Sequence, residues 1–301
     1  MMVEDRELSR HMKLPHPGIG ACARVDLEYG VDRPIVAPTS ASPCRSLWES
    51  VGWHRGVTLD PKMHSDDNNI ALALNIDGFQ PFNRGGITLH PLLLQVLNLP
   101  ENLRHRAEFM VLAGIIPGKQ APKNLNTYME PMVDELLRLY TKGFVYYDPN
   151  LKTPRRAFVK LLFTACDFPG HAFVNCMQKQ ASAFACHKCD IVGVVKPVNE
   201  GGTCRVLYGD FKGLARTPEV KPHPLTDAVY RQRAANFERL TEQHKSDFLD
   251  AHKARSSKMT LTKLKEKKSD QCRQVKGLSQ LARLPGFDMV DHTLLDLMHT
   301  V

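Results

Sequence analysis

Two short apolar runs, each closed by an aspartate, constrain the fold of this 301-residue chain most strongly. The first is IALALNID (70–77) and the second is RAFVKLLFTACD (156–167). A nearly continuous apolar run of this length is typical of a strand that is buried on both faces of a sheet. The sequence therefore predicts two buried strands that end at Asp77 and Asp167.

The segments between these runs predict the rest of an α/β domain. ITLHPLLLQVLNLP (87–100) and EFMVLAGIIPG (108–118) suit further strands of the same sheet, although the first could be partly helical. Residues 127–142 predict a helix, because their apolar side chains recur at helical spacing. Pro131 is tolerated only in the first turn of a helix, so the predicted helix begins near residue 127 or 130, and Gly143 marks its end.

The two ends of the chain have a different composition. Residues 1–60 are rich in Pro, Gly, Ser and charge, which predicts a loop-rich or disordered segment. Its apolar patch is expected to dock on the following domain through Leu47, Trp48, Val51 and Trp53. Residues 193–224 are rich in Gly and Pro, and residues 226–254 predict a long polar helix.

Charge and cysteine usage narrow the class of protein. The chain carries 40 Lys and Arg against 32 Asp and Glu, a net charge of +8 that favours polyanionic partners. Eight irregularly spaced cysteines do not suggest a disulfide framework. The sequence shows neither a signal peptide nor a transmembrane run, so we expect an intracellular protein without a membrane partner.

Asp77 and Asp167 are candidate metal ligands. Two carboxylates at adjacent strand ends can share a pair of Mg²⁺ ions, since Mg²⁺ prefers oxygen ligands and a pair of ions can drive phosphodiester chemistry. A purely structural interpretation stays open, in which Asp77 belongs to an Asp-Gly turn and Asp167 caps a strand before Pro169.

A Cys-x-x-Cys pair and a basic stretch are the other candidate sites. Cys186 and Cys189 have the spacing of two thiolates that chelate one Zn²⁺, although both could be ordinary buried thiols. The basic stretch could follow a DNA backbone or be a solvated helix or linker. Its candidate DNA-binding residues are Lys253, Arg255, Lys258, Lys263, Lys265, Lys267 and Lys268.

Several sequence blocks occur in an order that is typical of one protein family. They are IDGFQPF (76–82), VLNLPENLRHRAEFMVLAGIIPG (96–118), LNTYMEPMVDELLRLYTKG (125–143), TACDFPGHAF (164–173), FACHKC (184–189) and GLSQLARLPGFDMVDHTLLDLMH (277–299). Together they resemble the transposase of CACTA (En/Spm-type) cut-and-paste DNA transposons. The resemblance runs from about residue 69 to the end of the chain.

The resemblance implies a fold and a set of site residues. We expect an α/β fold with an RNase H-like mixed sheet, flanking helices and a largely helical, Cys-containing insertion. In that family the aspartates that match Asp77 and Asp167 are the first two acids of a DDE-type triad that holds Mg²⁺ or Mn²⁺. An Asp-x-Met-His block matches Asp296 and His299, and we expect His299 as a further Zn²⁺ ligand. Gly170 departs from the usual alanine of the family.

The resemblance places the third acid, a glutamate, beyond Val301. Asp296 is the more serious internal substitute, because it lies in an apolar run. The other acids nearby fit the solvated face of the polar helix; they are Glu238, Glu242, Asp247 and Asp250. We therefore expect no Mg²⁺-dependent strand cleavage by the 301-residue chain alone.

The domain organisation and function follow from the same resemblance. Residues 61–301 are expected to form an incomplete RNase H-like transposase domain, with 186–290 as its insertion. The leading hypothesis is a nuclear DDE-type transposase that acts on double-stranded DNA at transposon ends, as a homo-oligomer in a transposition complex. One alternative is a non-catalytic DNA- or protein-binding remnant of a transposase. The other is a zinc-stabilised interaction module unrelated to transposition.

Overall fold

The computed structural model describes residues 60–82, 86–119, 124–179, 182–197, 204–207, 223–254 and 271–295, with residue 122 and short pieces before residue 60. The chain divides into two compact units. Unit 1 comprises residues 1–165 and 283–287, and unit 2 comprises residues 166–282 and 288–301.

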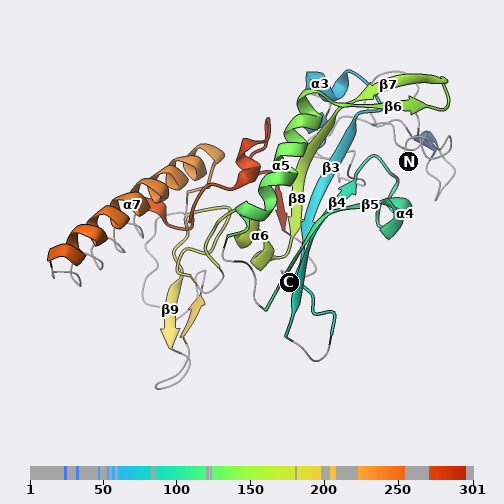
Figure 1. The fold of residues 1–301 in the computed structure, drawn as a ribbon. Coiled ribbons are helices and arrows are strands. Elements are labelled where there is room, and N and C mark those ends of the chain that lie inside the picture. Colours follow the sequence, from blue (N-terminus) through green and yellow to red (C-terminus); the bar gives the residue numbers. More distant parts are fainter. Residues whose placement is uncertain are drawn as a thin grey trace. The chain divides into compact units, whose positions relative to one another are not determined.

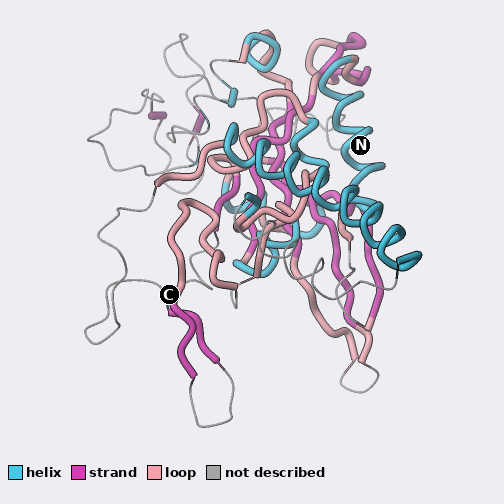
Figure 2. The backbone as a smooth tube through the Cα atoms, turned by 90° about the vertical axis from the view of Figure 1, so that its left-hand side faces the viewer, coloured by secondary structure: helices cyan, strands magenta, loops and turns pink. Residues whose placement is uncertain are grey.

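The centre of unit 1 is a mixed sheet (Figure 1). Its strands are β3 (Ile70–Ile76), β4 (Thr88–Val96), β5 (Met110–Gly118) and β8 (Val159–Cys166), and they lie in the order β8-β3-β4-β5. β3 pairs with β8 in parallel and with β4 antiparallel, and β4 pairs antiparallel with β5. Figure 2 shows strands side by side in magenta, seen from a second direction. The predicted α/β class with an RNase H-like mixed sheet is confirmed.

The sequence explains why β3 lies at the middle of this sheet. Six of its seven residues are buried, as expected for a strand covered on both faces. Part of the core forms around Trp53, Met63 and Leu162, with Leu47 packed at its border. The predicted docking of Trp53 and Leu47 is therefore confirmed, while Trp48 and Val51 lie outside the described residues.

The remaining elements of unit 1 surround the sheet. They are β1 (Arg24–Val25), β2 (Asp32–Arg33), α3 (Pro61–His64), α4 (Glu101–Arg104), the 3-10 helix Ala107–Phe109, α5 (Asn126–Thr141), β6 (Phe144–Asp148) and β7 (Thr153–Ala157). Figure 1 shows α5 running along β8 and β3. The predicted helix at 127–142 is thus confirmed within one residue at each end.

One premise of that prediction is wrong. Pro131 lies in the second turn of α5 rather than in its first, so the helix does not begin near residue 130. A proline there removes the amide that would bond to the carbonyl of Thr127. Pro131 and Thr127 are both exposed, so water can solvate this carbonyl. The buried side chains of Met129 and Val133 stabilise the helix around it.

Two conformational details bound the neighbouring elements. Gly143 has a φ of 68°, and a Cβ at this position would lie 2.5 Å from the carbonyl oxygen of Ala157. Glycine therefore ends α5, as predicted. The predicted strand 156–167 begins later than expected, at Val159, because Arg156 and Ala157 belong to β7.

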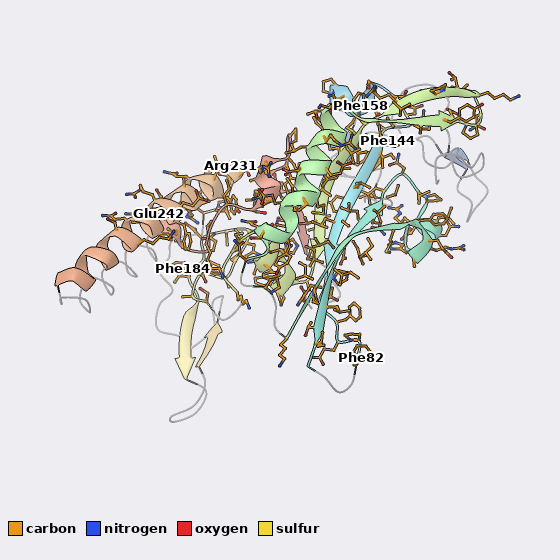
Figure 3. All side chains as sticks on the ribbon, in the orientation of Figure 1. Phe82, Phe144, Phe158, Phe184, Arg231 and Glu242 are labelled. Atoms are coloured by element: carbon orange, nitrogen blue, oxygen red, sulfur yellow. The ribbon has the colours of Figure 1, made fainter. Side chains whose placement is uncertain are left out.

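Unit 2 contains one long helix and several short elements. They are α6 (Phe168–Val174), β9 (Val194–Pro197), β10 (Cys204–Leu207), α7 (Asp227–Ala254), the 3-10 helix Gln280–Arg283, which continues into unit 1, and β11 (Thr293–Leu295). α7 confirms the predicted polar helix, and Figure 3 labels Arg231 and Glu242 on it. Glu238 and Glu242 are exposed, as expected for a solvated face. β9 and β10 form an antiparallel pair that the Gly- and Pro-rich sequence does not predict.

Candidate active site

Asp77 lies immediately after β3 and is exposed. Its Oδ1 accepts a hydrogen bond of 2.7 Å from the backbone amide of Gly78, as in an Asp-Gly turn. Among the described residues, Oδ2 accepts no hydrogen bond and the carboxylate forms no ion pair. The local turn therefore occupies one carboxylate oxygen and leaves the other available.

A histidine on the next strand lies against this turn. A Cβ at Gly78 would be 2.6 Å from Cε1 of His90, so the imidazole lies against the backbone that follows Asp77. Only glycine allows such a close approach without displacing a neighbour. The position of His90 could not be predicted from the sequence, because the contact depends on the pairing of β3 with β4.

The pairing of β3 with β8 relates the two candidate strand ends. In this parallel pair Leu74 lies opposite Thr164. Asp77 follows Leu74 by three residues, and Asp167 follows Thr164 by three residues. Since parallel strands end at the same edge of a sheet, the strand ends that precede the two aspartates lie at one edge.

Asp167 is the N-cap of α6. Its Oδ1 accepts a hydrogen bond of 2.6 Å from the amide of Gly170, and the helix has Pro169 in its first turn. An aspartate is favoured at this position because its side chain satisfies one of the free amides of the helix start. The carboxylate is half-buried, and Oδ2 accepts no hydrogen bond from the described residues. Asp77 thus lies in the Asp-Gly turn that the structural interpretation predicts, whereas Asp167 caps a helix rather than a strand. Each carboxylate keeps one available oxygen.

Two buried histidines lie in unit 2 near α6. His171, in α6, has its Nε2 at hydrogen-bonding distance from the carbonyl oxygen of Leu294, and burial lowers its pKa. His187 stacks on Phe168 with ring centroids 4.5 Å apart, and burial lowers its pKa to about 4. Both rings are therefore neutral at pH 7. They add no positive charge beside Asp167, and no motif in the sequence marks either of them as part of a site.

Cys186 and Cys189 lie close enough to act on one ion. Their sulfur atoms are 3.4 Å apart, and both side chains are partly exposed. Burial and the neighbouring Cys186 raise the pKa of the Cys189 thiol. The intervening Lys188 donates from Nζ to the carbonyl oxygen of Thr293 at 3.0 Å. The structure therefore brings the two thiols together, and their role as Zn²⁺ ligands stays a prediction.

The described residues do not supply a complete metal site. Within them, no group of three or more His, Cys, Asp or Glu side chains is arranged to hold a metal ion. Asp296 and His299 lie outside the described residues. Lys253 lies in α7, but its side chain is not described, and the other six predicted DNA-binding residues also lie outside. The metal-binding and DNA-binding roles of these residues therefore stay predictions.

The family model for transposase family tnp2 matches residues 44–212 of the chain. This match spans more than half of the sequence and includes both strand-ending aspartates and the cysteine pair. The chain belongs to the tnp2 transposase family. The comparison with curated proteins and the comparison with solved structures found no match.

Membership of the tnp2 transposase family confirms the coarser part of the sequence-based prediction. The match argues against the hypothesis of an interaction module unrelated to transposition. As for the membrane, none of the helices in the described part of the tnp2 chain is both long enough and apolar enough to cross a bilayer.

Proposed function

We propose that this tnp2 chain is the catalytic region of a DDE-type, CACTA-like transposase, in which Asp77 and Asp167 bind Mg²⁺ or Mn²⁺. The observation that supports it most is the parallel pairing of β3 with β8, because each strand leads directly into one of the two acids. The substrate class is double-stranded DNA at transposon ends. Action on chromosomal DNA would place the protein in the nucleus, as a homo-oligomer in a transposition complex.

The two aspartates suit a hard divalent cation chemically. Each carboxylate uses Oδ1 for a backbone amide and keeps Oδ2 free of hydrogen bonds from the described residues. A backbone hydrogen bond to one oxygen fixes the direction of the other, which is how outer partners orient a metal ligand. Asp77 and Asp167 would thus present one oriented oxygen each.

The roles of these residues would be binding and orientation. When bound, a pair of such ions polarises the scissile phosphodiester and activates the attacking oxygen. Asp77, held against Gly78, and Asp167, held by the start of α6, would keep their carboxylates fixed relative to their strands.

Cys186 and Cys189 would hold Zn²⁺ together with His299. The separation of their sulfur atoms, 3.4 Å, is near that of two thiolates on one tetrahedral ion. Zn²⁺ bound there would stabilise unit 2 and take no part in the phosphodiester chemistry.

Titration of Mn²⁺, followed by electron paramagnetic resonance, tests the acid site. We expect the Asp77→Asn and Asp167→Asn variants to bind Mn²⁺ at least about tenfold more weakly than the unaltered chain, since each loses one charged ligand. Glu242→Gln, which removes an exposed acid of α7, should leave the affinity unchanged. Equal Mn²⁺ affinity in all four proteins would refute the proposed acid pair.

A further inference from the structure

The hairpin of β6 and β7 presents two very different faces. Its strands pair so that Phe144, Tyr146 and Asp148 share one face with Arg155 and Ala157, while Val145 and Tyr147 share the other with Pro154 and Arg156. Figure 1 shows the hairpin extending beyond the sheet of unit 1. Figure 3 shows side chains on both of its faces, with Phe144 and Phe158 labelled at its base.

The inner face anchors the hairpin. Tyr146 and Asp148 are buried, and the ring of Tyr146 lies 5.9 Å from that of Phe144. Arg155 forms an ion pair with Asp148 inside the hairpin and a second one with Asp66, which joins this face to the rest of unit 1. A two-stranded hairpin is marginal by itself, so these contacts are what hold it in one conformation.

The turn of the hairpin keeps its only acid on this inner face. Oδ1 of Asp148 accepts hydrogen bonds from the amides of Asn150 at 2.8 Å and Leu151 at 3.2 Å. Lys152 then adopts a φ of 53° and its side chain is exposed. The turn therefore holds the negative charge inside and a positive charge at the tip.

The outer face is basic and partly apolar. Arg156 on this face and Lys152 in the adjoining turn are exposed, and neither forms an ion pair with a described residue. Arg156 donates from Nη1 to the carbonyl oxygen of Lys142 at 2.5 Å, which orients the guanidinium without neutralising it. On the same face as Arg156, 61% of Val145 and 49% of Tyr147 are exposed.

Protection of a strand edge does not account for this face. Charges that keep an edge soluble are normally accompanied by polar neighbours, because exposed apolar side chains work against that purpose. An exposed aromatic beside unpaired cations is instead typical of surfaces that contact nucleic acid. The phosphates of a duplex complement the charge of this face, which carries no exposed acid on β6, β7 or their turn.

We propose that the outer face of the β6–β7 hairpin binds the sugar-phosphate backbone of double-stranded DNA. This inference rests on the proposed function, because it assigns to the same protein a surface for its substrate. Lys152 and Arg156 bind phosphates, and the hydroxyl of Tyr147 donates to a phosphate oxygen between them. These contacts position the duplex and carry no sequence preference.

The test measures binding to a fluorescein-labelled 30-base-pair duplex of arbitrary sequence by anisotropy, at several KCl concentrations. Each phosphate contact contributes roughly eightfold to affinity at about 0.1 M salt. We therefore expect Lys152→Gln/Arg156→Gln to weaken binding on the order of 60-fold and to lower the salt slope by about 1.8. Tyr147→Phe should weaken binding severalfold without changing the slope.

A matched control removes the same charge elsewhere. Lys245→Gln/Lys276→Gln changes two exposed lysines of unit 2 and should keep the affinity within about twofold, with the salt slope unchanged. All the altered side chains are exposed, so the urea midpoint of every variant should equal that of the unaltered chain.

The outcomes of this test distinguish failure of the proposed hairpin surface from failure of the proposed function. If the unaltered chain binds the duplex and Lys152→Gln/Arg156→Gln binds equally well, the hairpin surface is refuted while the proposed function stands, and a protein partner becomes the better occupant. If the unaltered chain fails to bind duplex DNA even at about 50 mM salt, where phosphate contacts are strongest, both proposals are overturned.

Discussion

The buried ion pair between Lys160 and Asp60 leads to the sharpest prediction about the fold. Their side chains are 8% and 9% exposed, and Nζ lies 2.6 Å from Oδ2. Lys160 is on β8, the strand that leads to Asp167, while Asp60 caps α3. Tyr140 of α5 also donates its hydroxyl to Asp60, at 3.2 Å. One carboxylate thus joins a strand and two helices.

Replacing Lys160 with methionine should cost about 3 kcal/mol at pH 7. Breaking a buried pair by removing one partner costs about 3–5 kcal/mol, because it leaves a buried charge without its counter-ion. The lower end applies here, since Asp60 keeps hydrogen bonds from the amides of Lys62 at 3.0 Å and Met63 at 3.2 Å. The exposed lysine of Lys142→Met provides the control and should cost less than about 0.5 kcal/mol.

The stability that Lys160→Met loses should depend on pH. Burial by itself would raise the pKa of Asp60, but the hydrogen bond and charge of Lys160 outweigh burial and hold it below its ordinary value of 3.8. A carboxylate whose pKa is lowered by folding stabilises the folded state fully at a pH above its unfolded-state pKa. This stabilisation is lost as the pH falls through its folded-state pKa. The difference between the unaltered chain and Lys160→Met should therefore shrink as the pH falls below about 4.

Urea unfolding followed by tryptophan fluorescence measures this difference. Both tryptophans of the chain belong to unit 1, and Trp53 is buried in its core, so the signal reports the unit that contains the ion pair. A loss below about 1 kcal/mol at pH 7, or an equal loss at pH 7 and pH 3, would show that Lys160 does not stabilise an ionised Asp60.

Three further predictions concern other parts of the chain. Tyr230→Phe should lower the free energy of thermal unfolding by about 1–3 kcal/mol, because the hydroxyl accepts a hydrogen bond from the buried amide of Ser279 at 3.1 Å. An unchanged stability would mean that a water molecule takes the place of the hydroxyl. Gly78→Ala should lower the free energy of unfolding in urea by about 1–3 kcal/mol, because the added methyl group would collide with His90. His90→Ala should remove this collision, so strictly additive effects in the double variant would contradict the contact. Purified protein should contain about one zinc per chain, and Cys186→Ser should lose it; equal zinc contents would refute the zinc site.

Much of the fold could be predicted because its signals are local. The apolar run at β3 and the helical periodicity of α5 depend on neighbouring residues, and both elements lie within one residue of their predicted bounds. The position of Pro131 could not be predicted, because packing of the opposite face of α5 outweighs a rule about single residues.

Contacts between distant residues account for what the sequence did not predict. Lys160 and Asp60 are 100 residues apart, so their pairing depends on the register of the sheet and on the position of α3. The β6–β7 hairpin was missed because Pro154 and two arginines mask its second strand, although Asp148 and Pro149 are typical turn residues. The proximity of His90 to Gly78 likewise follows only from strand pairing.

The candidate site was predictable only in part, because its local signals are in the sequence but its strand pairing is not. The two apolar runs predicted strands that end at Asp77 and Asp167, and the parallel pairing of β3 with β8 places those strand ends at one edge of the sheet. Pairing of strands 90 residues apart cannot be deduced from the runs themselves. The role of the two aspartates as metal ligands stays a prediction.

A crystal structure of the chain soaked in MnCl₂, with anomalous scattering recorded at the manganese edge, tests the central claim most directly. We predict that the carboxylates of Asp77 and Asp167 lie within about 6 Å of each other, close enough to share metal, with a manganese peak bonded to an oxygen of each. Carboxylates more than about 10 Å apart, or manganese bound elsewhere only, would contradict the proposal that these two aspartates form the metal site of a transposase.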